Sequence, residues 1–133
     1  MQDLSLLQSI LLFAVPAVMA ITVHEAAHGF TARHFGDRTA EVLGRLTFNP
    51  LKHIDPSGTV AVPLGLLVMS KVTGAPLLIF GWAKPVPVGV RNLRNPQRDM
   101  AIVAAAGPAS NLAMAAGWTL VLVLTGMFGG GIQ

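Results

Sequence analysis

The chain of 133 residues contains no cysteine and few charged residues. The absence of cysteine excludes a disulfide scaffold and a cysteine-ligated metal site. Only 11% of the residues are charged, whereas an ordinary soluble domain carries about a quarter. Because 53% of the residues are hydrophobic, the composition also excludes a disordered chain and indicates a membrane protein.

The few charges are mostly basic, with nine Lys and Arg against six Asp and Glu. A net charge of +3 and a pI near 10.2 are compatible with nucleic-acid binding. However, the basic residues are clustered beside apolar runs, which suits lipid headgroups better. We therefore expect a lipid bilayer as a partner and no nucleic acid.

Two uncharged segments predict membrane-spanning helices. Residues 4–23 carry no charge, and about twenty helical residues cross the roughly 30 Å hydrocarbon core. With the polar residues that follow, this first apolar segment extends over 4–35. Residues 100–128 are also free of charge and form the second span. The sequence predicts an all-α polytopic membrane protein.

A third apolar segment, residues 59–80, is ambiguous because it contains Lys71 near its middle, followed by Gly74 and Pro76. A central lysine costs about 2.5 to 3.5 kcal/mol on insertion scales, and Gly with Pro favours a turn. The segment either crosses the membrane or enters and returns as a re-entrant hairpin. We favour the hairpin, since each side of the segment carries four basic residues and both connectors would then share the cytoplasmic side. The basic residues are Arg33, Arg38, Arg45 and Lys52 before the segment and Lys84, Arg91, Arg94 and Arg98 after it.

These connectors are residues 36–58 and 81–99. The first contains Asn49-Pro50 and Asp55-Pro56, pairs that stop helices. In the second, Val86, Val88 and Val90 alternate with other residues, which predicts a short strand at the membrane surface.

The strongest motif lies at the end of the first apolar segment, where His24, Glu25 and His28 form H-E-x-x-H. Residues four apart lie on one face of a helix, so both imidazoles can bind one zinc ion. Zinc lowers the pKa of water toward 7, and Glu25 can accept the proton as the general base and pass it to the leaving amine. The alternative is that the three residues only solvate a helix end that has left the bilayer. The motif predicts peptide hydrolysis.

Further motifs follow in order along nearly the whole chain, and together they are more specific than H-E-x-x-H alone. They are Val23-His24-Glu25-Ala26-Ala27-His28-Gly29, Phe35-Gly36-Asp37, Leu43-Gly44-Arg45, Asn49-Pro50-Leu51-Lys52-His53-Ile54-Asp55-Pro56, Gly81-Trp82-Ala83-Lys84-Pro85-Val86-Pro87-Val88 and Ala106-Gly107-Pro108-Ala109-Ser110-Asn111. This series resembles the site-2 protease family of intramembrane zinc metalloproteases, especially its short bacterial and archaeal members.

The resemblance implies roles for individual residues. His24 and His28 would be zinc ligands and Glu25 the general base. Gly107 and Asn111 match the family's G-x-x-x-N motif, which lies near the active site and would help to hold substrate or an extended strand. For Asn111, an interhelical hydrogen bond of purely structural value is an open alternative.

The sequence departs from the family at the third zinc ligand. Family members supply an aspartate from a Leu-Asp-Gly motif after the G-x-x-x-N helix, and residues 112–133 contain no such motif. Substitutes could come from Asp37, Asp55, Asp99, His34 or His53. We regard it as simpler that residues 1–133 are a partial intramembrane metalloprotease core, a fragment of a longer protease.

We therefore predict a zinc-dependent endopeptidase that cleaves transmembrane segments of membrane-protein substrates. It would be a multi-pass protein of the prokaryotic plasma membrane. The alternative is an inactive fragment or pseudoprotease that binds helices without cleaving them. Nothing in the sequence pattern specifies an oligomer.

Overall fold

The structure is a computed structural model that describes residues 4–76, 78 and 80–128. Its four α-helices are α1 (Leu6–His34), α2 (Thr39–Val42), α3 (Val62–Thr73) and α4 (Pro96–Phe128). Shorter helical turns are η1 (Pro50–Lys52), η2 (Pro56–Ala61), which is π-helical, and η3 (Val90–Asn92). The described residues are thus all helix or loop, which confirms the all-α prediction.

Local chemistry fixes where α1 begins and ends. The Ser5 side chain accepts from the Gln8 N–H, and the Gln8 side chain accepts from the Ser5 N–H, so both donors are satisfied. Pro16 lies inside the helix without ending it. After His34 the chain turns at Gly36, whose φ of 108° favours glycine.

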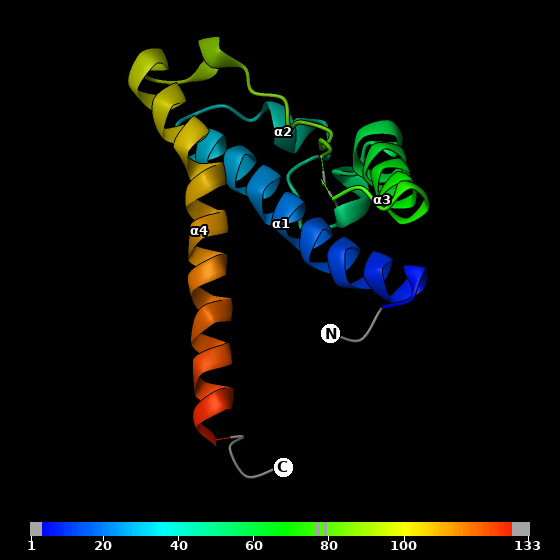
Figure 1. The fold of residues 1–133 in the computed structure, drawn as a ribbon. Helices are drawn as coiled ribbons and strands as arrows, with labels where there is room; N and C mark the ends of the chain where they lie inside the picture. The colour runs from blue at the N-terminus through cyan, green and yellow to red at the C-terminus, as the bar shows by residue number, and fades with distance from the viewer. Residues whose placement is uncertain (1–3, 77, 79, 129–133) are drawn as a thin grey trace.

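The two predicted spans form the long helices of the molecule. α1 has 29 residues and α4 has 33, and both are long and apolar enough to cross a membrane. Their most apolar windows are only 11% and 0% buried by the described chain, unlike the core helices of a soluble protein. α4 packs against the C-terminal part of α1, and the two helices then diverge (Figure 1).

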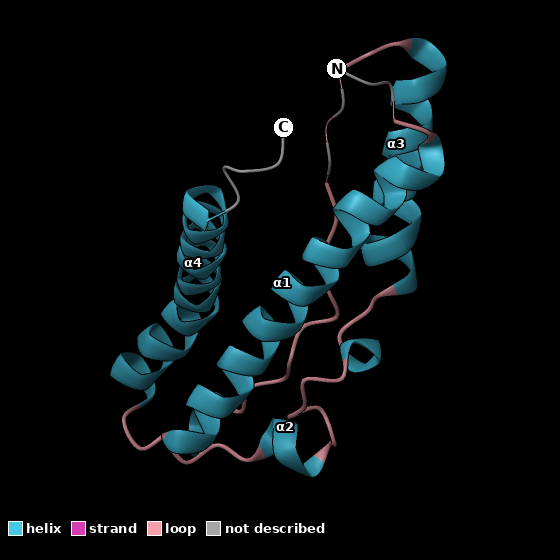
Figure 2. Cartoon of the chain, turned by 90° about the horizontal axis from the view of Figure 1, so that it is seen from below, coloured by secondary structure: helices cyan, strands magenta, loops and turns pink. Residues whose placement is uncertain are grey.

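The third apolar segment doubles back on itself. η2 and α3 lead away from Asp55, and Gly74 ends α3 with a φ of 71°. The chain then returns, so that the Trp82 N–H donates to the Gly58 carbonyl over 3.0 Å. The two ends of the segment therefore lie next to each other, and its re-entrant course in a membrane stays a prediction. α3 lies along the N-terminal half of α1 (Figure 2).

The predicted surface strand at Val86, Val88 and Val90 is wrong. Figure 2 shows no strand in the described chain, and residues 81–89 run as a loop. The physical reason is the choice of hydrogen-bond partners: the Val86 N–H donates to the Glu25 carboxylate and the Gly89 N–H to the Asp37 carboxylate. The loop is fixed by side chains instead of a neighbouring strand.

Candidate metal centre

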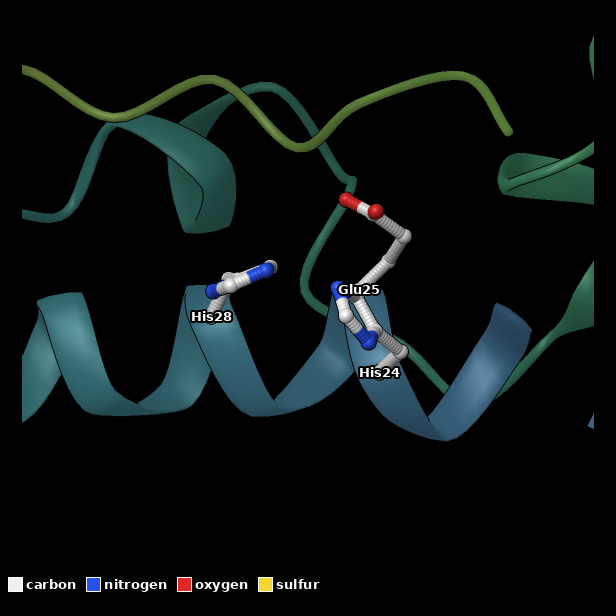
Figure 3. Close-up of side chains that lie close together, drawn as sticks. All are labelled: His24, Glu25 and His28. Atoms are coloured by element: carbon white, nitrogen blue, oxygen red, sulfur yellow. The ribbon is translucent and has the colours of Figure 1, made fainter. Parts of the chain in front are cut away.

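His24 and His28 lie one helical turn apart on α1, and their rings meet edge to face with centroids 4.7 Å apart. Glu25 joins them, and the possible ligand atoms of the three residues all lie within 4.8 Å of one another. Figure 3 shows the two histidine side chains next to each other on α1, and the Glu25 side chain projecting away from the same segment of the helix. Helical spacing alone brings this group together.

Gly107 of α4 lies directly opposite the two imidazoles. A methyl group at this position would lie 2.6 Å from the His24 Nε2 and 2.5 Å from the His28 Nε2. The absence of a side chain therefore keeps a space into which both Nε2 atoms point. The packing of α4 on α1 brings Gly107 to this position.

The Nδ1 atoms of both histidines have partners on α4. The His28 Nδ1 lies 2.7 Å from the Val103 carbonyl oxygen, to which it can only donate. This bond fixes the tautomer and leaves the Nε2 lone pair free to bind a metal ion.

The His24 Nδ1 lies 3.1 Å from the Asn111 amide nitrogen, and the Asn111 Oδ1 is buried without a partner. The oxygen and nitrogen of an amide exchange places by a rotation of the group. In the rotated orientation Oδ1 accepts from the His24 Nδ1–H, and the Nε2 of His24 becomes available as a ligand. Gly107 and Asn111, which the sequence motif singled out, thus both lie against the histidines in the structure.

The Glu25 carboxylate is held by the loop that crosses α1. Its Oε2 accepts from the Val86 N–H over 2.8 Å, so one oxygen is anchored. The other oxygen has no hydrogen bond to a described residue. The sequence did not reveal Val86 or Val103 as part of the site, because both contribute backbone groups that any residue type has.

The five substitute ligands considered above do not join the group. Asp37 accepts from Thr39, Gly89 and Asn92, and Asp55 caps η2 by accepting from Ser57 and Gly58. Asp99 accepts from the Asn95 N–H at the start of α4, and the His53 Nε2 contacts the Thr47 carbonyl. His34 stacks edge to face on Phe35.

The donor set suits zinc in its chemistry. Two neutral imidazoles with hydrogen-bonded Nδ1 atoms are usual zinc ligands, and the side-chain-free space at Gly107 lies between their Nε2 atoms. A carboxylate held beside them is the arrangement of a metal-dependent hydrolase.

Comparison with known proteins places the chain in a family. Residues 12–130 match peptidase family M50, and the chain belongs to it. This confirms the resemblance to the site-2 proteases.

Four similar curated proteins carry the name "Putative zinc metalloprotease". YwhC of Bacillus subtilis is 40% identical over 115 residues, which are 86% of this chain and 47% of YwhC. Rip2 of Mycolicibacterium smegmatis is 34% identical over 114 residues, which are 84% of this chain and 38% of Rip2. The chain therefore spans less than half the length of these relatives. No solved structure matches.

Proposed function

We propose that this chain carries two zinc ligands and the general base of an intramembrane endopeptidase. The observation that carries the proposal is the convergence of the His24 and His28 Nε2 atoms on the space beside Gly107, with the Glu25 carboxylate next to them. Membership in peptidase family M50 and the names of the relatives support the same chemistry.

In the proposed hydrolysis, Glu25, Val103 and Asn111 have different roles. When bound, zinc supplies a Lewis acid that polarises the scissile carbonyl and acidifies water. Glu25 takes a proton from the attacking water at the oxygen that Val86 does not hold, and passes this proton to the leaving amine. Val103 and Asn111 orient the two imidazoles through their Nδ1 atoms.

The position of the site along α1 supports cleavage within or at the edge of the bilayer. His24 lies 18 residues after Leu6, which is roughly 27 Å along the helix axis. If α1 begins at one membrane surface, the site lies near the opposite interface. Substrates would be membrane proteins whose transmembrane helix unwinds locally, because a helical peptide bond is protected by its own hydrogen bonds. The protein would be multi-pass, in a prokaryotic plasma membrane.

The decisive experiment is Glu25→Gln in the full-length protein reconstituted with a helical membrane substrate. We expect cleavage to fall by a factor of roughly 10² to 10⁴, the usual contribution of a general base, while the zinc content stays the same. Cleavage at the wild-type rate would show that Glu25 is not the base. His24→Ala is the comparison variant, and it should lose zinc and cleavage together.

The second candidate is a membrane module that binds helices without cleaving them. It is favoured by one observation: among the described residues, no Asp, Glu or His besides His24, Glu25 and His28 joins the metal-binding group. A catalytic zinc usually has three protein ligands. Wild-type protein that binds the substrate helix equally well with and without zinc, and never cleaves it, would support this candidate.

A further inference from the structure

The loop that holds Glu25 is anchored on both sides of the contact. We call residues 85–89 the strap. Before it, the Lys84 N–H donates to the His53 carbonyl over 3.0 Å, and the Lys84 carbonyl accepts from the Arg45 guanidinium over 3.0 Å. At its other end, the Gly89 N–H donates to the Asp37 Oδ2 over 2.8 Å. The strap therefore crosses α1 between two fixed points.

Two prolines stiffen the first half of the strap. Pro85 and Pro87 have no N–H, and each restricts φ, so Val86 is the one backbone donor within residues 85–87. That donor is directed at the Glu25 carboxylate. Val86 is only 7% exposed and packs against Gly29 of α1. A Cβ added at Gly29 would lie 3.3 Å from the Val86 Cγ1. Packing and hydrogen bonding thus fix the same residue.

Asp37 is the buried residue that anchors the Gly89 end of the strap. Its carboxylate is 2% exposed and accepts from the Thr39 backbone and hydroxyl, from the Asn92 amide and from the Gly89 N–H. Gly89 fits closely here, because an added Cβ would lie 2.6 Å from the Asn92 Nδ2 and 3.0 Å from the Asp37 Oδ1. A buried carboxylate with this many donors rigidly defines where the strap ends.

We propose that Asp37 is a positioning residue for the reaction: by anchoring Gly89 it sets the strap so that the Val86 N–H holds one Glu25 oxygen and leaves the other free. Asp37 touches neither metal ligand and acts through the strap. The inference rests on the proposed function, in which Glu25 is the base, but the anchoring itself can be measured without any cleavage assay.

The first measurement is amide hydrogen exchange at Val86 and Gly89 in the full-length protein. Asp37→Ala should raise both exchange rates at least tenfold. The Gly89 N–H loses its acceptor, and the released strap no longer holds the Val86 N–H steadily against the Glu25 carboxylate. The matched control is Asp99→Ala, since Asp99 is equally buried but accepts from the Asn95 N–H at the start of α4. It should leave exchange at Val86 unchanged. Unchanged exchange at Val86 in Asp37→Ala would overturn the proposal.

The second measurement separates positioning from general stability. Asp37→Ala should lower kcat roughly 10- to 100-fold, the usual range for residues that orient a catalytic group, with KM and zinc content unchanged. Val86→Pro removes the N–H and should do the same, whereas Val86→Ala keeps the N–H and should retain most of the activity. Since both residues act through one hydrogen bond, the double variant Asp37→Ala, Val86→Pro should lose no more than either single variant.

The outcomes distinguish the two proposals. Additive losses in the double variant, or faster cleavage after Val86→Pro, would overturn the positioning role. If Asp37→Ala does not fold, Asn92→Ala removes one donor to Asp37 and should shift Val86 exchange in the same direction, and no shift would count against the proposal. A wild-type protein that binds zinc but never cleaves would defeat the proposed function, while exchange at Val86 would still decide whether Asp37 holds the strap.

Discussion

Gly107 shows how a residue without a side chain can shape a candidate metal site. The sequence offered only its match to a G-x-x-x-N motif, but in the structure its Cα faces both histidine Nε2 atoms. A glycine in a helix costs up to about 1 kcal/mol relative to alanine, so its presence needs a reason. The space between the two imidazoles is that reason.

We expect Gly107→Ala to abolish zinc binding. The added methyl would lie 2.5 to 2.6 Å from both Nε2 atoms and would occupy the space into which they point. The measurement is the zinc content of purified protein by elemental analysis. The matched control is Gly117→Ala on the same helix, where an added Cβ meets nothing within 4 Å. Normal zinc content in Gly107→Ala would contradict the assigned site.

Asp37 also predicts an acid dependence of stability. Burial opposes ionisation, but hydrogen bonds from Thr39, Asn92 and Gly89 outweigh it and hold the pKa of the Asp37 carboxyl below its ordinary value of 3.8. A carboxyl with a lowered pKa in the folded state stabilises the fold above the ordinary value. This stabilisation is lost as the pH falls below 3.8 and through the folded-state pKa.

The stability advantage of the wild type over Asp37→Asn should therefore be largest at neutral pH and shrink as the pH falls below about 3.8. Thermal unfolding of both proteins in detergent across this range measures it. A difference that stays constant with pH would show that the Asp37 carboxylate contributes nothing through its charge.

At the scale of elements, the hairpin formed by η2, α3 and the returning chain depends on one close contact. Gly58 lies against the indole ring of Trp82. The Gly58 carbonyl also accepts a hydrogen bond from the backbone N–H of Trp82. Thr59 adds a bond from its hydroxyl to the Trp82 carbonyl. The base of the hairpin is therefore closed by a glycine packed against an aromatic ring.

We expect Gly58→Ala to destabilise the hairpin by about 1 to 3 kcal/mol, the usual cost of overpacking, because the new methyl would overlap the Trp82 ring. Gly65→Ala in α3 is the control, since an added Cβ there meets nothing within 4 Å and should be neutral or slightly stabilising. Unfolding midpoints of both variants, followed by Trp fluorescence, give the comparison. Equal midpoints would show that the contact is not tight.

On the scale of the whole molecule, the charges are distributed unevenly between the two ends of α1. The connectors rich in Arg and Lys lie where α1 ends and α4 begins (Figure 1). At the other end, the Lys71 ammonium lies 3.4 Å from the Leu4 carbonyl, so the tip of the hairpin reaches the N-terminal end of α1. The positive-inside rule therefore predicts that the connectors face the cytoplasm and that the hairpin tip faces away from it.

The chain lacks cysteine, so single cysteines can report this topology. Lys52→Cys and Arg91→Cys, in the two connectors, should both react with an impermeant reagent from the cytoplasmic side. Val72→Cys, which replaces an exposed residue near the hairpin tip, should not react from that side. Labelling of Lys52→Cys and Arg91→Cys from opposite sides would contradict the re-entrant form.

The sequence by itself determined the helices and the chemistry of α1. Apolar runs 4–35 and 100–128 specify long helices because burial in lipid leaves the backbone no partner but itself. The spacing of His24, Glu25 and His28 brings them together through helical geometry alone. For 59–80 the sequence left both a crossing helix and a re-entrant hairpin open, and Lys71, Gly74 and the basic residues on both sides only favoured the hairpin.

Only the tertiary structure decided what faces these residues. That Gly107 lies opposite the imidazoles depends on how α4 crosses α1, which no local pattern encodes. The alternating valines predicted a strand, but the Val86 and Gly89 amides are bound by Glu25 and Asp37, residues more than fifty positions away. Backbone donors are the same in every residue, so only the packed chain determines which acceptor each one meets.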